Sequence, residues 1–205
     1  MKICLLPGDG IGVEIVDAAV EVLDAAAKKF GFEIEYDKQL IGGCAIDATG
    51  VPLPKATIAS AKAADAVLLG AVGGPKWDNV APDIRPEKGL LGIRKALGLY
   101  CNLRPMTVSK FTAHLSPLKA ERAEGADLLI VRELTGGIYF GEHNEAHLNA
   151  DGVEEASDIE LYTRPEVERI ARFAFEAAKN RRGKVTSVDK ANVLGSSRMW
   201  RKIVA

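Results

Sequence analysis

The chain has 205 residues, a formal net charge of -1, 47% hydrophobic residues and 27% charged residues. This balance is typical of an ordinary soluble globular protein of one large or two small domains, and it excludes a general attraction to nucleic acid or to an anionic membrane surface. No apolar run reaches the roughly 18 residues of a membrane helix, and the run after Lys2 stops at Pro7, too early for the core of a signal peptide.

The first 72 residues alternate between strand and helix patterns. Apolar residues recur at helical spacing over 11–30, and Gly31 closes that helix. Around it we expect buried strands at 2–7 and 65–72, a strand of alternating pattern at 32–37 and a short helix at 54–63. Strands that alternate with helices predict an α/β fold with a largely parallel core.

The pattern changes character after a Gly-, Pro- and Asp-rich loop at 73–86 and a helix at 87–97 that stops at Gly98. We therefore place a domain boundary near residue 98, between 1–98 and 99–205. Thr163 and Glu166 have capping-box spacing and predict a helix that runs to about Asn180. The remaining expected elements are strands at 99–105, 127–134, 138–142, 158–164 and 184–190, the third and fourth as a possible antiparallel pair, and a final helix over the last ten residues.

The first turn, GDGIG at residues 8–12, lies where a strand passes into a helix. Such a turn can hold a pyrophosphate at the helix N-terminus, but the dinucleotide fingerprint is G-x-G-x-x-G, one residue longer, and Asp37 comes late for its acidic partner. The other interpretation is a tight turn with positive φ in which Asp9 or Gly10 caps the helix. We favour the turn over the dinucleotide site.

Arginines supply the stronger functional signal. Glu87, Leu90 and Arg94 fall at i, i+3 and i+7 and share one helix face, a mixture that suits a core stripe poorly. Arg104 follows in NLRP, and Arg132 ends a nearly all-apolar strand, where a charge needs a buried partner. The guanidinium fork binds carboxylates, so three arginines in one cleft would hold a small polyanionic acid, although each arginine alone is more often a surface or ion-paired residue.

Tyr139, after a TGG turn, and Lys190, at the end of an expected strand, are candidate proton-transfer groups, since arginines and poor solvation lower the pKa of a lysine. We exclude a metal site at His143 and His147, because HNEAH is not H-E-x-x-H and the segment reads as a solvated loop. Three scattered cysteines indicate a reduced, cytoplasmic protein without a reactive-cysteine arrangement. They are Cys4, Cys44 and Cys101.

Several long blocks occur together in the order typical of one family. They are LLPGDGIGVE, LLGAVGGPKWD, RPEKGLLGIRKALGLYCNLRP, VRELTGGIYFGE and VDKANVL. From residue 3 to residue 201 the chain resembles the isocitrate/isopropylmalate β-decarboxylating dehydrogenases. The resemblance implies a two-domain α/β fold that is not a classical Rossmann fold and a homodimer. Residues 1–98 would belong to the cofactor-side domain and 99–205 to a second domain with dimerisation elements, both incomplete.

The resemblance also implies a reaction: NAD-dependent oxidative decarboxylation of 3-isopropylmalate to 2-oxo-4-methylpentanoate in leucine biosynthesis. Hydride leaves the hydroxyl-bearing carbon for NAD, the β-keto acid loses carbon dioxide, and the enolate is protonated. A divalent metal, Mg²⁺ or Mn²⁺, would polarise the oxygen. The apolar GLL block favours the isopropyl branch over the isocitrate-type substrate.

The roles implied by the resemblance cover substrate, catalysis and cofactor. Arg94, Arg104 and Arg132 would hold the carboxylates, Leu90 and Leu91 would face the isopropyl group, Glu87 would lie near substrate and nicotinamide, Lys190 would deprotonate the hydroxyl in the partner subunit's site, and Tyr139 would protonate the enolate. The implied cofactor contacts are Ile11 on the adenosine side, Gly73, Gly74, Pro75, Lys76, Trp77 and Asp78 in the loop, and Glu87 and Asn192 near the nicotinamide.

One departure from the family concerns the metal. The family's metal-binding aspartates include a D-x-x-x-D helix, and this sequence has no two aspartates four apart. We therefore expect the metal ligands and the adenosine loop beyond residue 205 and expect the 205-residue chain to be an inactive fragment. The alternatives are a non-catalytic product that dimerises or binds a dicarboxylate, and a decarboxylating dehydrogenase for malate, tartrate or isocitrate.

Overall fold

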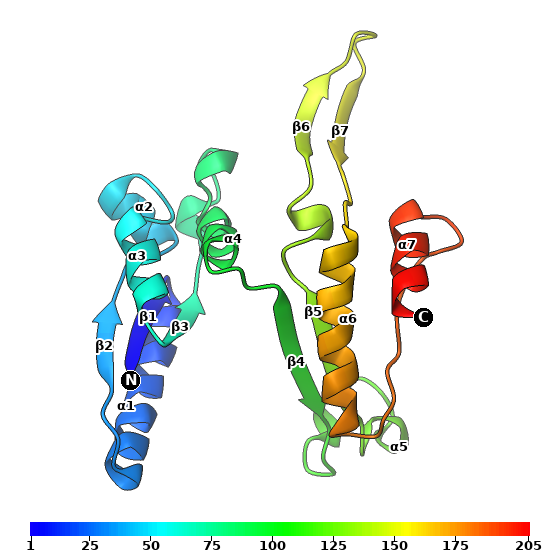
Figure 1. The fold of residues 1–205 in the computed structure, drawn as a ribbon. Helices are drawn as coiled ribbons and strands as arrows, with labels where there is room; N and C mark the ends of the chain where they lie inside the picture. The colour runs from blue at the N-terminus through cyan, green and yellow to red at the C-terminus, as the bar shows by residue number, and fades with distance from the viewer. The chain divides into compact units, whose positions relative to one another are not determined.

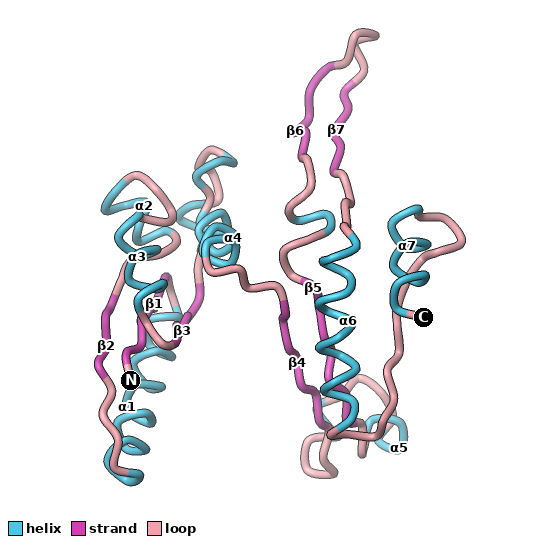
Figure 2. Tube along the Cα trace, in the orientation of Figure 1, coloured by secondary structure: helices cyan, strands magenta, loops and turns pink.

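The computed structural model describes residues 1–205, which form two compact units, Met1–Gly98 and Leu99–Ala205. Each unit is described by itself, and Figures 1 and 2 show their elements. None of the helices combines the length and the apolar character needed to cross a bilayer. The chain is mixed α/β, as the sequence predicts.

The first unit is built on a three-stranded parallel sheet in the order β2-β1-β3. In the register of this sheet, Ile3 of the central strand lies opposite Tyr36 on one side and Ala66 on the other. The helices and strands of the unit are β1 (Lys2–Gly8), α1 (Ile11–Phe30), β2 (Glu35–Lys38), α2 (Gly43–Thr49), α3 (Lys55–Ala63), β3 (Ala66–Ala71) and α4 (Pro86–Ala96), with short 3-10 turns η1 (Pro75–Trp77) and η2 (Pro82–Ile84) before α4. The predicted parallel core and the helix at 11–30 with its left-handed Gly31 cap are confirmed.

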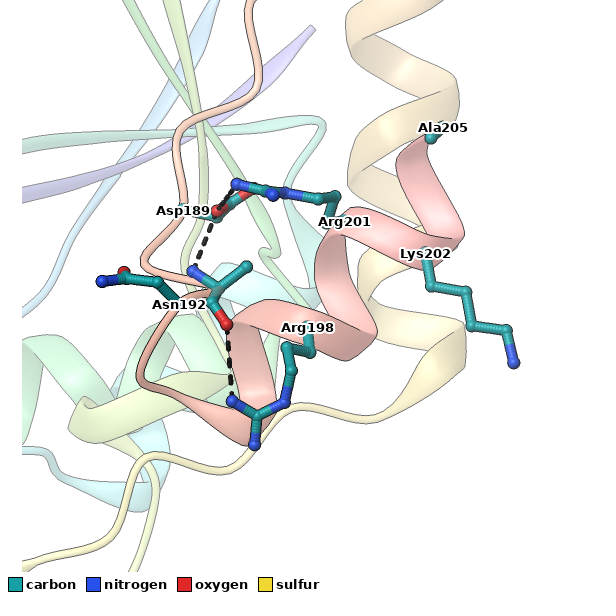
Figure 3. A pocket seen from close by; sticks show the side chains of 7 residues that line it. Asp189, Asn192, Arg198, Arg201, Lys202 and Ala205 are labelled. Atoms are coloured by element: carbon teal, nitrogen blue, oxygen red, sulfur yellow. Dashed lines mark hydrogen bonds and ion pairs between the residues drawn. The ribbon is translucent and has the colours of Figure 1, made fainter.

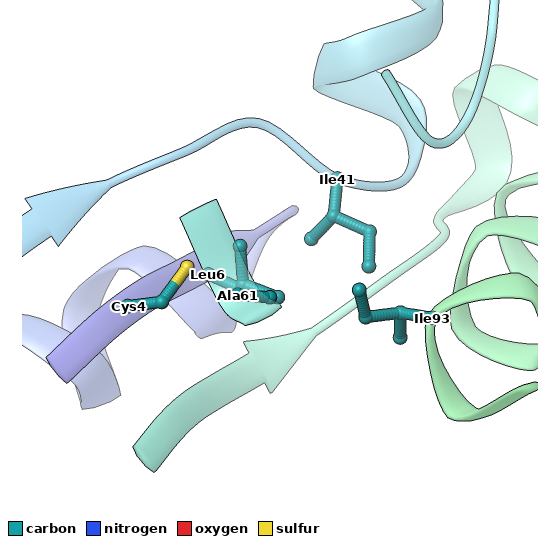
Figure 4. Packing of buried hydrophobic residues seen from close by; sticks show 5 residues of the cluster. All are labelled: Cys4, Leu6, Ile41, Ala61 and Ile93. Atoms are coloured by element: carbon teal, nitrogen blue, oxygen red, sulfur yellow. The ribbon is translucent and has the colours of Figure 1, made fainter. Parts of the chain in front are cut away.

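Strand β1 builds the core because its two faces are both covered. Cys4 and Leu6 point to one side, where they pack with Ile41, Ala61 and Ile93 (Figure 4). The alternate residues of the strand pack against α1 on the other side. Side chains in a strand alternate between faces, so one buried strand with apolar residues at every position holds helices on both sides.

The second unit contains two separate antiparallel pairs, β4-β5 and β6-β7. Helix α6 contacts β5 on one side and α7 on the other. The β6-β7 hairpin is exposed along its whole length and extends away from α6 (Figure 1). The elements are β4 (Cys101–Thr107), η3 (Ala113–Leu115), α5 (Ala120–Ala123), β5 (Asp127–Glu133), η4 (Gly137–Tyr139), β6 (His143–Leu148), β7 (Glu154–Asp158), α6 (Arg164–Lys179) and α7 (Gly195–Val204).

Three sequence-based expectations in this unit are wrong. The strand expected at 138–142 is absent: Ile138 and Tyr139 belong to the 3-10 turn η4 and residues 140–142 are turn and loop, because Gly137 has φ 75° and ends the extended backbone. The segment from His143 to His147, expected as a loop, is strand β6, and its all-polar, all-exposed surface gave no apolar alternation to detect. The strand expected at 158–164 is absent, because β7 already ends at Asp158, residues 159–163 have no regular structure and α6 begins at Arg164.

The stretch 184–190 also differs from its prediction. It contains no strand, and no ladder of backbone hydrogen bonds joins it to another segment. Val188, central in this stretch, is 87% exposed. An apolar alternating pattern indicates a strand only when a neighbour can pair with it.

Candidate functional site

The loop from Gly73 to Asp78 and the start of α4 meet in the first unit. Gly73 has φ 93°, and a Cβ there would lie 3.0 Å from the Glu87 carboxylate. Pro86, Gly89 and Ile93 form the buried face of α4, so Glu87 is turned away from the core. The structure thus brings together two predicted cofactor residues, Gly73 and Glu87, and leaves a side-chain-free backbone beside a carboxylate.

The other face residues of α4 follow from the same helical spacing. Leu90, Leu91 and Arg94 are each half-buried beside the core stripe. The predicted common face of Glu87, Leu90 and Arg94 is therefore distinct from the face that packs into the core.

Helix α2 holds the rest of the loop. The Trp77 ring covers Gly43 so closely that a Cβ on Gly43 would come within 2.3 Å of it. Asp47 accepts hydrogen bonds from Lys76 Nζ at 2.6 Å and Trp77 Nε1 at 3.2 Å. The hydrogen bond from Lys76 is the main cause that lowers the pKa of Asp47. Lys76 and Trp77 are therefore engaged in fixing the loop on α2, while Gly73 and Gly74 form its open part.

Asp9 supports the predicted cofactor loop instead of capping α1. Of the two N-cap candidates, Asp9 and Gly10, the structure has Gly10, without a side-chain hydrogen bond. Its carboxylate is 4% exposed and accepts backbone N–H bonds from Gly43 and Cys44 at 2.7 Å each and from Gly73 at 2.8 Å. Asp9 thus ties the GDGIG turn to the start of α2 and to the predicted cofactor loop.

The glycines of the GDGIG turn serve close packing. A Cβ on Gly12 would lie 2.2 Å from the Pro7 carbonyl oxygen and 2.6 Å from the Ala71 nitrogen. Gly8 has φ 70° and approaches the Ala71 carbonyl. This geometry agrees with the tight-turn interpretation. Ile11, the predicted adenosine contact, is 59% exposed at the first position of α1.

Arg104, Arg132 and Tyr139 come together in the second unit. Asn102 lies opposite Arg132 in the β4-β5 register, and Arg104 is two residues from Asn102, so all three side chains stand on one face. Arg104 Nε donates to Asn102 Oδ1 at 2.9 Å. The Arg132 guanidinium carbon lies 5.0 Å from the Tyr139 ring centroid. Two predicted carboxylate anchors and the predicted proton donor therefore share one surface.

The buried charge at the end of β5 is Glu133, which the sequence reading did not single out. Its side chain is 1% exposed and pairs with Arg169 of α6 at 2.6 Å. Arg132 itself is half-buried over Tyr139, so the expectation that Arg132 needs a buried partner applies to its neighbour instead. The sequence REL at residues 132–134 could have indicated Glu133, because an acidic residue at the end of an apolar strand also requires a partner when it is buried.

Lys190 and Asn192 lie in the loop that leads into α7 (Figure 3 shows Asn192). The Lys190 carbonyl accepts the N–H groups of Val193 and Leu194, and both predicted side chains are exposed. Arg201 pairs with Asp189 at 2.7 Å in the same loop, and its hydrogen bond is the main cause that lowers the pKa of Asp189. No hydrogen bond or ion pair joins Lys190 to the Arg132–Tyr139 cluster. A cavity of about 690 Å³ lies between this loop and α7. It is lined by Asp189, Ala191, Asn192, Arg198, Arg201, Lys202 and Ala205.

A divalent metal finds no donor set here. The chain contains no group of three or more His, Cys, Asp or Glu side chains that could hold one. His143 and His147 are each paired with a carboxylate of β7, Asp158 and Glu155, respectively.

Comparison with known proteins gives consistent matches along the chain. The family model described as isocitrate/isopropylmalate dehydrogenase matches residues 2–205. A 3-isopropylmalate dehydrogenase of Bacillus licheniformis is 59% identical over 201 residues, 98% of this chain and 54% of that protein. A 3-isopropylmalate dehydrogenase of Bacillus subtilis is 54% identical over 202 residues, 98% of this chain and 55% of that protein.

Solved structures agree with the fold. An isocitrate dehydrogenase of Methylococcus capsulatus matches with TM-score 0.77 at 34% identity, covering 99% of this chain and 55% of that one. A β-decarboxylating dehydrogenase of Thermococcus kodakarensis matches with TM-score 0.69 at 36% identity, covering 99% of this chain and 53% of that one. The chain spans about half the length of the curated relatives it matches. It belongs to the isocitrate/isopropylmalate dehydrogenase family.

Proposed function

We propose that this protein acts in the NAD-dependent oxidative decarboxylation of 3-isopropylmalate to 2-oxo-4-methylpentanoate, a step of leucine biosynthesis. Relatives named 3-isopropylmalate dehydrogenase at 54% to 59% identity support the substrate. The observation that carries the proposal is the face of the β4-β5 pair that bears Arg104 and Arg132, with the Arg132 guanidinium over the Tyr139 ring. Such a surface suits an acid that must be held by its carboxylates and then protonated at carbon.

The chemistry assigns a task to each residue. Arg104 and Arg132, with Arg94, bind the two carboxylates of the substrate. Lys190 takes the proton of the substrate hydroxyl as hydride leaves the carbon that bears this hydroxyl. Carbon dioxide then departs from the resulting β-keto acid, and the electrons of the broken carbon–carbon bond remain in an enolate. Tyr139 supplies the proton that completes the product. Leu90 and Leu91 provide the apolar contact for the isopropyl branch.

The first unit suits a nicotinamide cofactor. Gly73 and Gly74 give the loop a backbone without side chains, and a Cβ on Gly73 would lie 3.0 Å from the Glu87 carboxylate. When bound, NAD would accept the hydride. Pro75, Lys76, Trp77 and Asp78 would shape the neighbouring wall and Ile11 would reach the adenosine, while Asn192 would approach the nicotinamide. The residues of this chain do not fit Mg²⁺ or Mn²⁺, and no step here is assigned to a metal.

Assembly and location complete the proposal. We assign a homodimer in which Lys190 serves the partner subunit's site, so that dimerisation contributes a catalytic group. The reduced cysteines fit a cytoplasmic enzyme.

The test uses the whole natural polypeptide and follows NADH absorbance with 3-isopropylmalate. Wild type is expected to reduce NAD, and Arg132→Gln or Arg104→Gln should lower kcat/KM by about tenfold or more, because a charged hydrogen bond contributes about 1.5–3 kcal/mol. Arg172→Gln, at an exposed position on α6, is the matched control and should leave the rate unchanged. Arginine variants that match wild type would contradict the proposed substrate surface.

A further inference from the structure

We propose that Glu133 is a positioning residue for Tyr139, and that it acts through Arg169 and Thr135. This inference rests on the proposed function for the role of Tyr139. Glu133 lies on the face of β5 opposite to Arg132, and its carboxylate is engaged with Arg169 of α6 and with Thr135.

The ion pair is two-pronged and directional. Arg169 Nε and one terminal nitrogen donate to the two carboxylate oxygens of Glu133, at 3.2 and 2.6 Å. The guanidinium also lies 4.7 Å from the Tyr100 ring centroid, at the residue just before β4. Hydrogen bonding to Glu133 raises the pKa of Arg169. A buried ion pair gains little over an apolar pair in stability, so its contribution here is to fix geometry.

Thr135 transmits that geometry into the turn that carries Tyr139. Its backbone N–H and its hydroxyl both contact the same Glu133 oxygen, at 3.0 and 3.1 Å. Arg169 donates to the Thr135 hydroxyl at 2.7 Å, which closes a three-residue ring. Every polar group of this ring has a charged or charge-assisted partner. The backbone and side chain of Thr135, the first residue of the TGG turn, are therefore held in one conformation.

The glycines remove the remaining freedom of this turn. Gly136 and Gly137 are buried, and the Gly137 N–H donates to the Leu161 carbonyl oxygen at 2.8 Å. A Cβ on Gly137 would meet the Tyr162 hydroxyl, so only glycine fits at that approach. Two residues later the backbone reaches Tyr139, whose ring lies under the Arg132 guanidinium. The hydrogen bonds among Glu133, Thr135 and Arg169 therefore fix one end of the segment that presents the phenol. The hydrogen bond from the Gly137 N–H to the Leu161 carbonyl fixes its middle.

The experiment is a double-mutant cycle on the whole natural polypeptide. Glu133→Gln is measured in the wild-type and in the Tyr139→Phe backgrounds, with kcat and KM for 3-isopropylmalate. We expect Glu133→Gln to lower kcat by about tenfold or more in wild type, since displacement of a reacting group by about 1 Å costs up to about 100-fold. In Tyr139→Phe it should lower kcat by less than about twofold, because the group being positioned is already gone.

A structural control and a milder variant accompany the cycle. Val167→Ala removes fully buried volume from the same helix α6 and should lower stability with equal, small effects on kcat in both backgrounds. Thr135→Val keeps the ion pair and the backbone N–H bond to Glu133 and removes only the hydroxyl contacts with Glu133 and Arg169, so it tests the same link if Glu133→Gln fails to fold. Equal loss of kcat in both backgrounds for Glu133→Gln, or wild-type kcat for Thr135→Val, would overturn the inference.

Amide hydrogen exchange separates this inference from the proposed function. Exchange over residues 135–141 should accelerate in Thr135→Val and Glu133→Gln but not in Val167→Ala, whether or not the protein turns over 3-isopropylmalate. Unchanged exchange in both turn variants overturns the positioning role. Faster exchange in the two variants, together with a wild-type protein that fails to reduce NAD, would instead overturn the proposed function alone.

Discussion

Asp9 is a buried carboxylate whose three hydrogen-bond partners are all backbone N–H groups. Asp9→Asn is expected to lower the free energy of unfolding by about 1–3 kcal/mol, because the amide NH₂ would face donors and leave a buried N–H without an acceptor. Urea unfolding measures the change. Asp65→Asn is the control, since Asp65 is exposed and accepts only the Lys2 N–H, and it should change stability by less than about 0.5 kcal/mol. Equal losses for the two variants would contradict this account of Asp9.

Asp189 gives a pH dependence of known sign. Hydrogen bonds from Arg201 and from the Ala191 N–H lower the pKa of Asp189 in the folded protein. The ionised carboxylate therefore contributes its full stabilisation above the pKa of the unfolded chain, about 3.9. That contribution is lost as pH falls through the lower folded pKa. Asp189→Asn should therefore lower Tm at pH 7 and flatten the decline of Tm below about pH 4. Parallel Tm curves for wild type and variant through the acid range would contradict the assignment.

At the scale of elements, α2 acts as the platform for the 73–78 loop. Gly43→Ala would place a Cβ 2.3 Å from the Trp77 ring, so the ring must leave the helix. In a Trp200→Phe background, where Trp77 is the remaining tryptophan, its emission should shift to longer wavelength and Tm should fall. Gly195→Ala is the control, because its Cβ would meet only the end of Arg198 at 3.6 Å. An unshifted Trp77 spectrum in Gly43→Ala would contradict the platform.

The sequence predicted best those elements whose neighbours are local. The apolar repeat of helix 11–30 and the following Gly31 mark the extent of that helix, β1 and β3 carry apolar runs, and the segment before and within β2 alternates between apolar and polar residues. The stretch 184–190 has a strand pattern without a pairing partner, and β6 is a strand with no apolar face at all. Pairing between strands is a tertiary property, so periodicity alone cannot decide either case.

In the candidate site, too, sequence spacing indicated some residues, whereas others became evident only from the fold. Spacing alone placed Glu87, Leu90 and Arg94 on one helix face unsuited to a core stripe, and in the structure other residues of α4 form its buried face. The contact of Arg132 with Tyr139 depends on how the TGG turn folds back over β5, and the reach of Asp9 to Gly73 crosses 64 residues. Residue types at fixed spacing therefore indicated the chemistry, whereas the supporting residues Asp9, Glu133 and Arg169 required the fold.

At the scale of the whole molecule, each unit carries its own group of predicted site residues. The first unit holds Gly73 and Glu87 on the predicted cofactor side, and the second holds Arg104, Arg132 and Tyr139. The family match runs through both units without interruption. The central claim is accordingly one reaction on one substrate, and it is tested most directly by substrate preference.

The decisive measurement is kcat/KM of the whole natural polypeptide for NAD reduction with 3-isopropylmalate, isocitrate, malate and tartrate. The account predicts a preference of at least about tenfold for 3-isopropylmalate over malate, because burial of an added apolar branch contributes about 1–3 kcal/mol. Leu90→Ala should narrow that preference. Equal or faster turnover of isocitrate, malate or tartrate by the wild-type protein would contradict the proposed function.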